Sequence, residues 1–324
     1  MYINKSLIYN SSISNIYKAE DDENNQLVCL KVVSLDFKIP PHSIINEIKA
    51  LKSLNHPNIL QYINHYTIGD DMYLVSPLYK YNLTQLIQKK YSKSTLNINL
   101  DSNFTLKNLI SEEDIISFLK SMSSALAHIH QSGIIHRDIK PENIFFNEDL
   151  TQPVIGDFGI CYHESDPSID EPLNMKYIDV CSSIFQPPEL LLGITDYSFE
   201  IDIWSLAIIV TVLFSKNLKS VLIINDPELS NDSQISALPL LHSIFKSLGT
   251  PTTQDSNSEL FWPELIEKTH FKDFNLTVYP RLSYDDILPK CKNEKLKEIF
   301  SKMIKYDRFN RISALELHEE LETL

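Results

Sequence analysis

The chain has 324 residues, of which 43% are hydrophobic, so it can bury a substantial core as one two-lobed domain or two smaller ones. A formal net charge of -14 and a pI near 5.1 argue against nucleic acid or an anionic membrane surface as its main partner. Its four cysteines form no Cys-x-x-Cys pair and its N-terminus lacks an apolar signal segment, so we expect a soluble protein of the cytoplasm, the nucleus or both.

The first 78 residues predict a small lobe made mainly of strands. Short β-prone segments lie around Leu7–Ile8, Ile16–Ala19, Leu27–Val33 and Met72–Val75. The segment Ile44–Leu54 instead places apolar side chains three and four residues apart, which is the spacing of a helix with one buried face. A sheet with one helix beside it is therefore expected.

From residue 79 to residue 324 the pattern becomes mainly helical. Ser111–Asp114 carries an N-terminal capping signal for a helix that Gly133 would end. Three further segments with helical spacing are 201–214, 240–248 and 295–304. Three polar stretches are interpreted as surface insertions, the first as a disordered loop: 92–108, 162–178 and 215–234. One α+β domain over 1–324, with a β-rich lobe and a larger helical lobe, is therefore expected.

The strongest chemical signal is the segment His136–Asn143, followed by the tripeptide Asp157–Gly159. Either one alone would be a weak signal, but both occur in this order after the capped helix. They resemble the catalytic loop and the metal-binding Asp-Phe-Gly motif of protein kinases. The resemblance implies the bilobal protein kinase fold, transfer of the γ-phosphate of ATP to a protein substrate, and Mg²⁺ as the metal.

The residue types in these segments suit phosphoryl transfer, which depends on positioning and charge neutralisation. Asp138 can accept a hydrogen bond from the attacking hydroxyl, and Lys140 can neutralise charge on the γ-phosphate. Asn143 and Asp157 offer oxygen atoms to Mg²⁺, a hard cation that binds few protein ligands. A lysine at position 140 resembles the serine/threonine kinases rather than the tyrosine kinases.

An upstream lysine and a glutamate complete the expected catalytic set. Val28–Lys31 resembles the strand motif whose lysine holds the α- and β-phosphates, and Glu47 lies where kinases carry the ionic partner of that lysine. A Lys–Glu pair is more often a solvated surface contact, but Lys31 ends an apolar strand and Glu47 lies in an apolar helix. Cys29 is expected to be an inert buried thiol in the adenine roof.

The glycine-rich phosphate loop of protein kinases is missing. By position, its three glycines correspond to Tyr9, Ser11 and Ser14, and no glycine precedes Gly69. Glycine lets a backbone approach phosphates and adopt a positive φ without a Cβ clash. The loop is therefore expected to be stiffer or further from the nucleotide, with the Ser11 and Ser14 hydroxyls as donors.

The remaining nucleotide contacts follow from the same resemblance. Ser76 falls at the gatekeeper position, where a small side chain leaves the pocket behind the adenine open. The other positions expected to contact the nucleotide are Ile8, Ile16, Leu78, Tyr79, Asn82 and Phe145.

Pro187–Glu189 stands where protein kinases carry Ala-Pro-Glu, and three further segments resemble the cyclin-dependent-kinase branch of the family, namely Leu190–Gly193, Leu240–Pro251 and Phe261–Pro263. Leu35–His42, which reads Leu-Asp-Phe-Lys-Ile-Pro-Pro-His, takes the place of the cyclin-reading helix sequence. With the glycine-free loop, it resembles the monomeric CDK-activating kinases of budding yeasts over nearly the whole chain. This implies a monomer that phosphorylates the activation-loop threonine of cyclin-dependent kinases in the cell cycle, with no obligatory cyclin.

The activation segment departs from the cyclin-dependent kinases at the residue that they phosphorylate. Counting back from Pro187, that position is Tyr177, so threonine phosphorylation is not available there. Arg137 still places a cation nearby, and we hypothesise that one acid supplies a standing negative charge: Asp170, Glu171 or Asp179. Ser182 replaces the usual threonine of the substrate-facing loop, and Gln186 replaces an arginine, so proline-directed specificity is not assumed.

Two alternative interpretations stay open. A pseudokinase or scaffold is suggested by the missing glycines and opposed by the intact catalytic set. A conventional cyclin-dependent kinase is disfavoured by Pro40, Pro41 and Tyr177, and would be stimulated by a cyclin.

Overall fold

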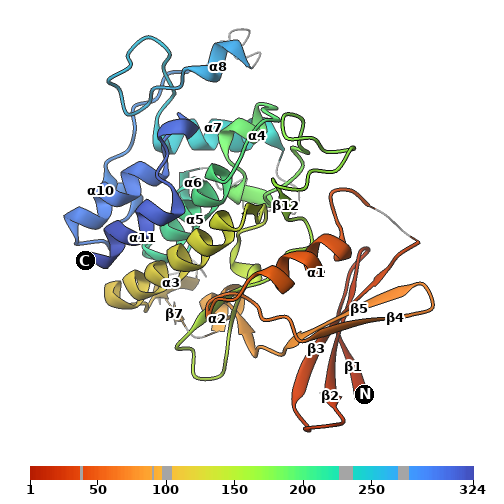
Figure 1. Cartoon of the computed structure of the whole chain (residues 1–324). Helices are drawn as coiled ribbons and strands as arrows, with labels where there is room; N and C mark the ends of the chain where they lie inside the picture. Colours follow the sequence, from red (N-terminus) through yellow and green to blue (C-terminus); the bar gives the residue numbers. More distant parts are fainter. Residues whose placement is uncertain (37–38, 90, 97–103, 226–235, 269–276) are drawn as a thin grey trace.

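The computed structural model describes all residues of the chain except 37–38, 90, 97–103, 226–235 and 269–276. Figure 1 shows a twisted sheet with one helix beside it at one end of the molecule and a larger, mainly helical part at the other. The prediction of a bilobal α+β fold is confirmed.

The small lobe is built on one antiparallel sheet of five strands in the order β1-β2-β3-β5-β4. The strands are β1 (Tyr2–Asn10), β2 (Asn15–Asp21), β3 (Leu27–Ser34), β4 (Asn64–Ile68) and β5 (Asp71–Pro77). One face packs a small apolar cluster of Ala19, Val28, Leu30 and Val75. In the register of the sheet, Ile16 lies opposite Lys31 and Cys29 lies opposite Ser76, so these four side chains share the other face.

Helix α1 (Ile44–Ser53) lies beside the sheet, on the side of the helical lobe (Figure 1). It begins where Ser43 caps it, because the Ser43 hydroxyl accepts a hydrogen bond from the Asn46 amide. Ile44, Ile48 and the other apolar residues of one face are buried, and this same face carries Glu47. The helix therefore brings a carboxylate into the interior of the molecule.

The large lobe contains the remaining helices. They are α2 (Leu83–Lys89), α3 (Glu112–Gln131), α4 (Pro188–Leu191), α5 (Glu200–Leu213), α6 (Val221–Asn225), α7 (Ala237–Leu248), α8 (Glu264–Glu267), α9 (Tyr284–Ile287), α10 (Glu294–Met303) and α11 (Ala314–Glu322). Short strands accompany them at β6 (Tyr81–Asn82), β9 (Ile134–Ile135), β10 (Ile144–Phe146), β11 (Pro153–Ile155) and β12 (Tyr162–His163). In the part of the chain that the structure describes, no helix combines the length and apolarity needed to cross a bilayer.

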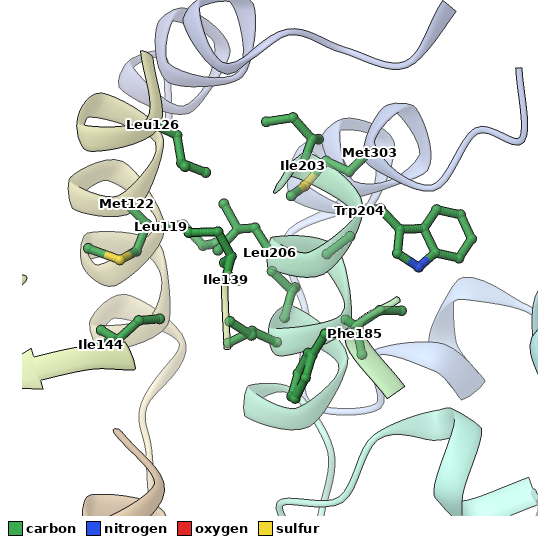
Figure 2. Packing of buried hydrophobic residues seen from close by; sticks show 14 of the residues in the cluster. Leu119, Met122, Leu126, Ile139, Ile144, Phe185, Ile203, Trp204, Leu206 and Met303 are labelled. Atoms are coloured by element: carbon green, nitrogen blue, oxygen red, sulfur yellow. The ribbon is translucent and has the colours of Figure 1, made fainter. Parts of the chain in front are cut away.

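The core of the large lobe lies around α5, which is buried on nearly every side. Figure 2 shows Ile139, the residue after Asp138, between α3 and α5, near Leu119 and Leu206. Ile139 is buried, and burial of a side chain of this size stabilises by about 2 kcal/mol. The packing of Ile139 therefore fixes the loop that carries Asp138 to the centre of the lobe.

The stretch at 92–108 differs from the disordered surface loop that was expected. Residues Ser92–Leu96 and Phe104–Asn108 pair as the antiparallel strands β7 and β8, and 97–103 lie outside the described residues. The last residue, Asn108, is buried because its amide nitrogen donates hydrogen bonds to the carbonyl oxygens of Leu213 and Ser215. A polar side chain can thus be an anchor in the core, which composition alone does not reveal.

The other two stretches are only partly at the surface where they are described, and residues 165–170 of the first are exposed as expected. Within 162–178, the side chains of Tyr162, Glu171 and Lys176 are buried among polar partners. Within 215–225, Ser215 and much of the segment up to helix α6 belong to the core. Residues 226–234 of the third stretch lie outside the described residues.

Candidate active site

The three ionic residues predicted at the nucleotide site lie together. The Nζ atom of Lys31 is 2.7 Å from Oε2 of Glu47 and 2.6 Å from Oδ1 of Asp157. Burial would lower the pKa of Lys31, but the two carboxylates outweigh it and the pKa is raised. Burial would likewise raise the pKa of Asp157, but Lys31 holds it below its usual range. The lysine therefore stays cationic and the aspartate anionic.

Two glycines allow this close packing. A Cβ atom on Gly159 would lie 3.1 Å from Nζ of Lys31 and 3.2 Å from Oδ1 of Asp157, where the ion pair is. A Cβ atom on Gly156 would lie 2.6 Å from the ring of Phe145. Asp157 itself has a positive φ of 59°, so the backbone on both sides of it is fixed by steric demands.

The catalytic loop holds Asp138 between two donors of its own segment and one hydroxyl. Nδ2 of Asn143 donates to Oδ2 of Asp138 at 2.9 Å, and Nζ of Lys140 lies 2.8 Å from the same oxygen. The Ser182 hydroxyl donates to Oδ1 of Asp138 at 2.7 Å and accepts from Lys140 at 2.9 Å. Ser182 thus connects the activation segment to the two residues that the sequence places at the phosphoryl group.

The backbone of the loop is held from behind by Asp202 on α5. The amides of His136 and Arg137 each donate to its carboxylate at 2.9 Å, and Nε2 of His130 lies 3.0 Å away. Asp202 is fully buried; burial alone would raise its pKa, but its donors hold the pKa below the usual value. The loop that presents Asp138 is therefore anchored at its backbone as well as by Ile139.

Arg137 finds its negative partner in the activation segment. Its guanidinium forms a buried ion pair with Glu171, and its Nε donates to the carbonyl oxygen of Ile160 at 2.5 Å. Oε1 of Glu171 also accepts from the amide of Tyr177 at 2.9 Å. Of the three acids considered from sequence, only Glu171 makes a described ion pair with Arg137.

Lys176 is a second buried cation of the same segment, and sequence reasoning missed it. Its Nζ donates at 2.6 Å to the carbonyl oxygens of Leu173 and Tyr197, and lies 5.1 Å and 5.4 Å from the ring centres of Tyr162 and Tyr197. Burial lowers its pKa. No spacing rule could have found this site, because its partners are carbonyl groups and rings rather than a carboxylate.

The predicted hinge positions lie at the end of β5 and in the segment that follows it. Ser76, near the end of β5, is buried opposite Cys29, and burial raises the pKa of the Cys29 thiol to about 11. The ring of Tyr79 stacks on Phe145 with centroids 6.0 Å apart. Asn82 pairs with Phe145 between β6 and β10. Leu78 lies between Pro77 and Tyr79 and is partly buried.

The hairpin without glycine is closed by a serine hydroxyl. The amides of Ile13 and Ser14 donate to Oγ of Ser11 at 3.2 Å and 3.0 Å, and the Ser11 hydroxyl donates to the Ser14 carbonyl at 3.1 Å. No residue from Ile8 to Ile16 has a positive φ. The structure thus differs from the expectation of a free Ser11 donor, because this hydroxyl closes the turn. Ile8 is largely exposed, at an irregularity in the pairing of β1 with β2.

The oxygen donors at the cleft fit Mg²⁺ bound together with a nucleotide. Asn143 uses its Nδ2 to bind the carbonyl and carboxylate oxygens of Asp138, so its Oδ1 is directed elsewhere and can accept. Asp157 supplies a carboxylate at the same cleft. Two protein ligands suit Mg²⁺, which takes its other oxygens from phosphates and water. Lys31 and Lys140 provide the positive charge that the phosphates of ATP require.

Comparisons with known proteins agree with this geometry. The sequence profile of the protein kinase domain matches residues 2–321. The chain is 29% identical over 276 residues to the serine/threonine-protein kinase CAK1 of Saccharomyces cerevisiae, covering 76% of this chain and 73% of that protein. It is 32% identical over 270 residues to a probable serine/threonine-protein kinase of Arabidopsis thaliana, covering 80% of this chain and 32% of that protein.

Proposed function

The chain belongs to the protein kinase family, and on that premise we propose that it is an active serine/threonine kinase whose substrates are cyclin-dependent kinases. The observation that carries the proposal is the complete ionic set in one cleft: Lys31 with Glu47 and Asp157, and Lys140 with Asp138. A pseudokinase that had lost turnover would be under no demand to keep both sets of ionic contacts.

The side chains perform the transfer by position and charge. Asp138 accepts a hydrogen bond from the substrate hydroxyl, whose oxygen then bonds to the γ-phosphorus of ATP while the bond to the bridging oxygen of ADP breaks. The hydroxyl proton leaves toward Asp138, and Lys140 stabilises the charge on the transferred group. Mg²⁺, held by Asn143 and Asp157 with phosphate oxygens, would supply charge neutralisation. Lys31 orients the remaining phosphates.

We also propose that the kinase needs no phosphate on its activation segment. In kinases of this branch the arginine beside the catalytic aspartate is neutralised by a phosphorylated residue. Here Glu171 is already in that position and also orders the backbone at Tyr177. The segment continues to Ser182, which contacts Asp138 directly, so an ordered segment favours a correctly placed catalytic carboxylate.

The proposed substrate class rests on resemblance. The segment Leu35–His42, of which residues 37 and 38 lie outside the described part, and the similarity to CAK1 support a kinase that phosphorylates the activation-loop threonine of cyclin-dependent kinases. Pro40 and Pro41 stand where a cyclin-reading sequence would be, which supports a monomer that acts without an obligatory cyclin. We propose a role in the cell cycle, in the cytoplasm, the nucleus or both.

A transfer experiment tests this proposal. The purified chain is incubated with Mg²⁺, ATP and an unphosphorylated cyclin-dependent kinase, and the modified residue is mapped by mass spectrometry, with Asp138→Ala as the control. We expect one phosphate on the activation-loop threonine with wild type and none with the control. Equal signals from both would favour the scaffold alternative, and phosphate transfer only after addition of a cyclin would favour a conventional cyclin-dependent kinase.

A further inference from the structure

His42 comes at the end of the Leu35–His42 segment, and the backbone places it at the phosphate side of the cleft. The next residue, Ser43, donates its amide hydrogen to the carbonyl oxygen of Gly159 at 2.8 Å. Gly159 is the glycine whose Cβ position would lie within 3.2 Å of both Lys31 and Asp157. His42 is therefore one residue away from a backbone contact with Gly159, beside which the ion pair that would meet the phosphates and the metal lies.

The His42 side chain is exposed in part, and charges of the catalytic site act on its ring. The groups that act on its ring are Asp157, Lys31, Asp138 and Lys140. Burial lowers the pKa of the imidazole, and the two lysines act in the same direction against the two aspartates. A neutral imidazole carries one N–H donor, which a phosphate oxygen can accept without any proton transfer.

Two backbone donors of the hairpin that would cover the phosphates are already in use. In the hairpin between β1 and β2, the amides of Ile13 and Ser14 are bonded to the Ser11 hydroxyl. These are backbone groups of the kind that a glycine-rich loop directs at phosphates. A hydrogen-bond donor on another element, close to the same place, would restore part of what the hairpin does not offer.

We propose that the His42 imidazole binds the terminal phosphate of ATP and takes over part of the role of the missing glycine-rich loop. The inference rests on the proposed nucleotide site and adds a contact to it. Because ADP lacks the terminal phosphate, His42 contributes to the affinity for ATP and not to the affinity for ADP. It thereby favours binding of the substrate nucleotide over retention of the product.

Calorimetric titration of the full-length protein in Mg²⁺ tests this, with ADP and with adenylyl imidodiphosphate, a triphosphate analogue whose terminal phosphate is not transferred. Loss of one hydrogen bond to a charged group is expected to weaken analogue binding by about tenfold in His42→Ala and to leave ADP binding unchanged. His42→Gln, which keeps an N–H donor, is expected to recover part of the affinity. His242→Ala, whose imidazole contacts Tyr279 on the large lobe, is the matched control and should change neither.

Three results would overturn the inference. Equal weakening of both nucleotides in His42→Ala would show that the residue supports the fold or the adenosine end. Unchanged binding of both nucleotides by His42→Ala would show that the imidazole does not contact the terminal phosphate. If wild type bound neither nucleotide, both the proposed nucleotide site and the inference about His42 would be wrong. If wild type transferred phosphate normally and His42→Ala bound the analogue normally, only the inference about His42 would be wrong.

Discussion

The catalytic loop at His136–Asn143 and the hairpin at Ile8–Ile16 both belong to the predicted nucleotide site, but they are held in different ways. The loop is anchored on several sides: Asp202 binds its backbone, Ile139 is packed between α3 and α5, and Ser182 contacts its aspartate. The hairpin is largely exposed, and its turn is closed by one serine hydroxyl.

This difference shows where the chain can depart from its family. Groups that meet the reacting atoms must be held to a fraction of an ångström, so their supports are buried and numerous. A hairpin that only covers the phosphates can change its residues if another element supplies the lost contacts. The comparison predicts large effects for changes in the loop and its supports, and small effects for changes in the hairpin.

The largest effect is expected for Asp138→Asn. Without the carboxylate, the substrate hydroxyl loses its acceptor, and kcat should fall by about a thousandfold. Asparagine has nearly the same shape, so the variant should still fold cooperatively, although Lys140 loses its ionic partner. Steady-state kinetics with a protein substrate measure this, and retention of more than about a tenth of wild-type kcat would contradict the assigned role.

Glu171→Gln is expected to have the second largest effect. The substitution keeps the shape but leaves the buried Arg137 cation without its anion, which costs about 3 kcal/mol of stability. Because the segment leads to Ser182 and Asp138, kcat should also fall, by about tenfold or more. Asp170→Asn and Asp179→Asn are the matched controls. If all three variants had wild-type activity and unfolding midpoints, the standing charge would not be at Glu171.

A prediction at the gatekeeper residue Ser76 tests the shape of the adenine pocket rather than its charges. Ser76 is small and buried beside Cys29, so an ATP analogue with a benzyl group on N6 should enter the pocket behind the adenine. Its KM is expected within about tenfold of that for ATP, and Ser76→Phe should abolish its use while ATP is still accepted. A KM far above this range for wild type would mean that the pocket is closed.

A smaller effect is expected for Ser11→Ala in the hairpin. The variant loses the hydroxyl that closes the turn, but the turn is partly exposed, so KM for ATP should rise by about threefold with little change in kcat. Ser11→Gly should be no better than Ser11→Ala, because no residue of this hairpin needs a positive φ. A thousandfold loss of kcat/KM in either variant would show that the hairpin matters as much as the catalytic loop.

The last effect is a dependence of stability on pH that comes from the catalytic-loop side. Burial lowers the pKa of His136 below its ordinary value of 6.5, against the nearby aspartates. Above pH 6.5 the His136 imidazole is neutral in both the folded and the unfolded state. Below pH 6.5 this imidazole takes up a proton in the unfolded state but not in the folded state. Stability should therefore fall on acidification below 6.5, by up to about 1.4 kcal/mol per pH unit for each such proton.

Urea unfolding at pH 7.5, 6.5 and 5.5 measures this slope. Burial also lowers the pKa values of His56 and His163, so they add to it in the same direction. His136→Gln should reduce the slope, and stability that rose below pH 6.5 would contradict a neutral buried imidazole. The hairpin from Ile8 to Ile16 contains no histidine and should contribute nothing.

Much of the fold could be predicted from the sequence because its elements are encoded locally. The spacing of Ile44, Ile48 and Leu51 predicts α1, and the Ser111 cap places the start of α3, where the Ser111 hydroxyl accepts from the Asp114 amide. The residues of His136–Asn143 are close in sequence, so their proximity to one another required no knowledge of the fold. By contrast, the resemblance implied only Glu47 as the partner of Lys31, and the pairing of Lys31 with Asp157, which joins the two lobes, was not anticipated.

The rest depended on long-range contacts that no local pattern contains. Asp170, Glu171 and Asp179 all carry a carboxylate, and only the path of the chain brings that of Glu171 to Arg137. Lys176 looks like a solvated surface lysine in sequence, but its carbonyl and ring partners bury it. The same cause explains why parts of the expected surface insertions are buried, since some polar residues there find polar partners inside the molecule.

The most direct test of the account is the activity of the chain without any phosphate on its activation segment. The protein is treated with phosphatase, its intact mass is measured to show that no phosphate is left, and its initial rate of transfer to a protein substrate is compared with that of the untreated protein. Because Glu171 already neutralises Arg137, the account predicts equal rates. A rate that collapses after phosphatase treatment, and returns when a phosphate is restored to the segment, would contradict it.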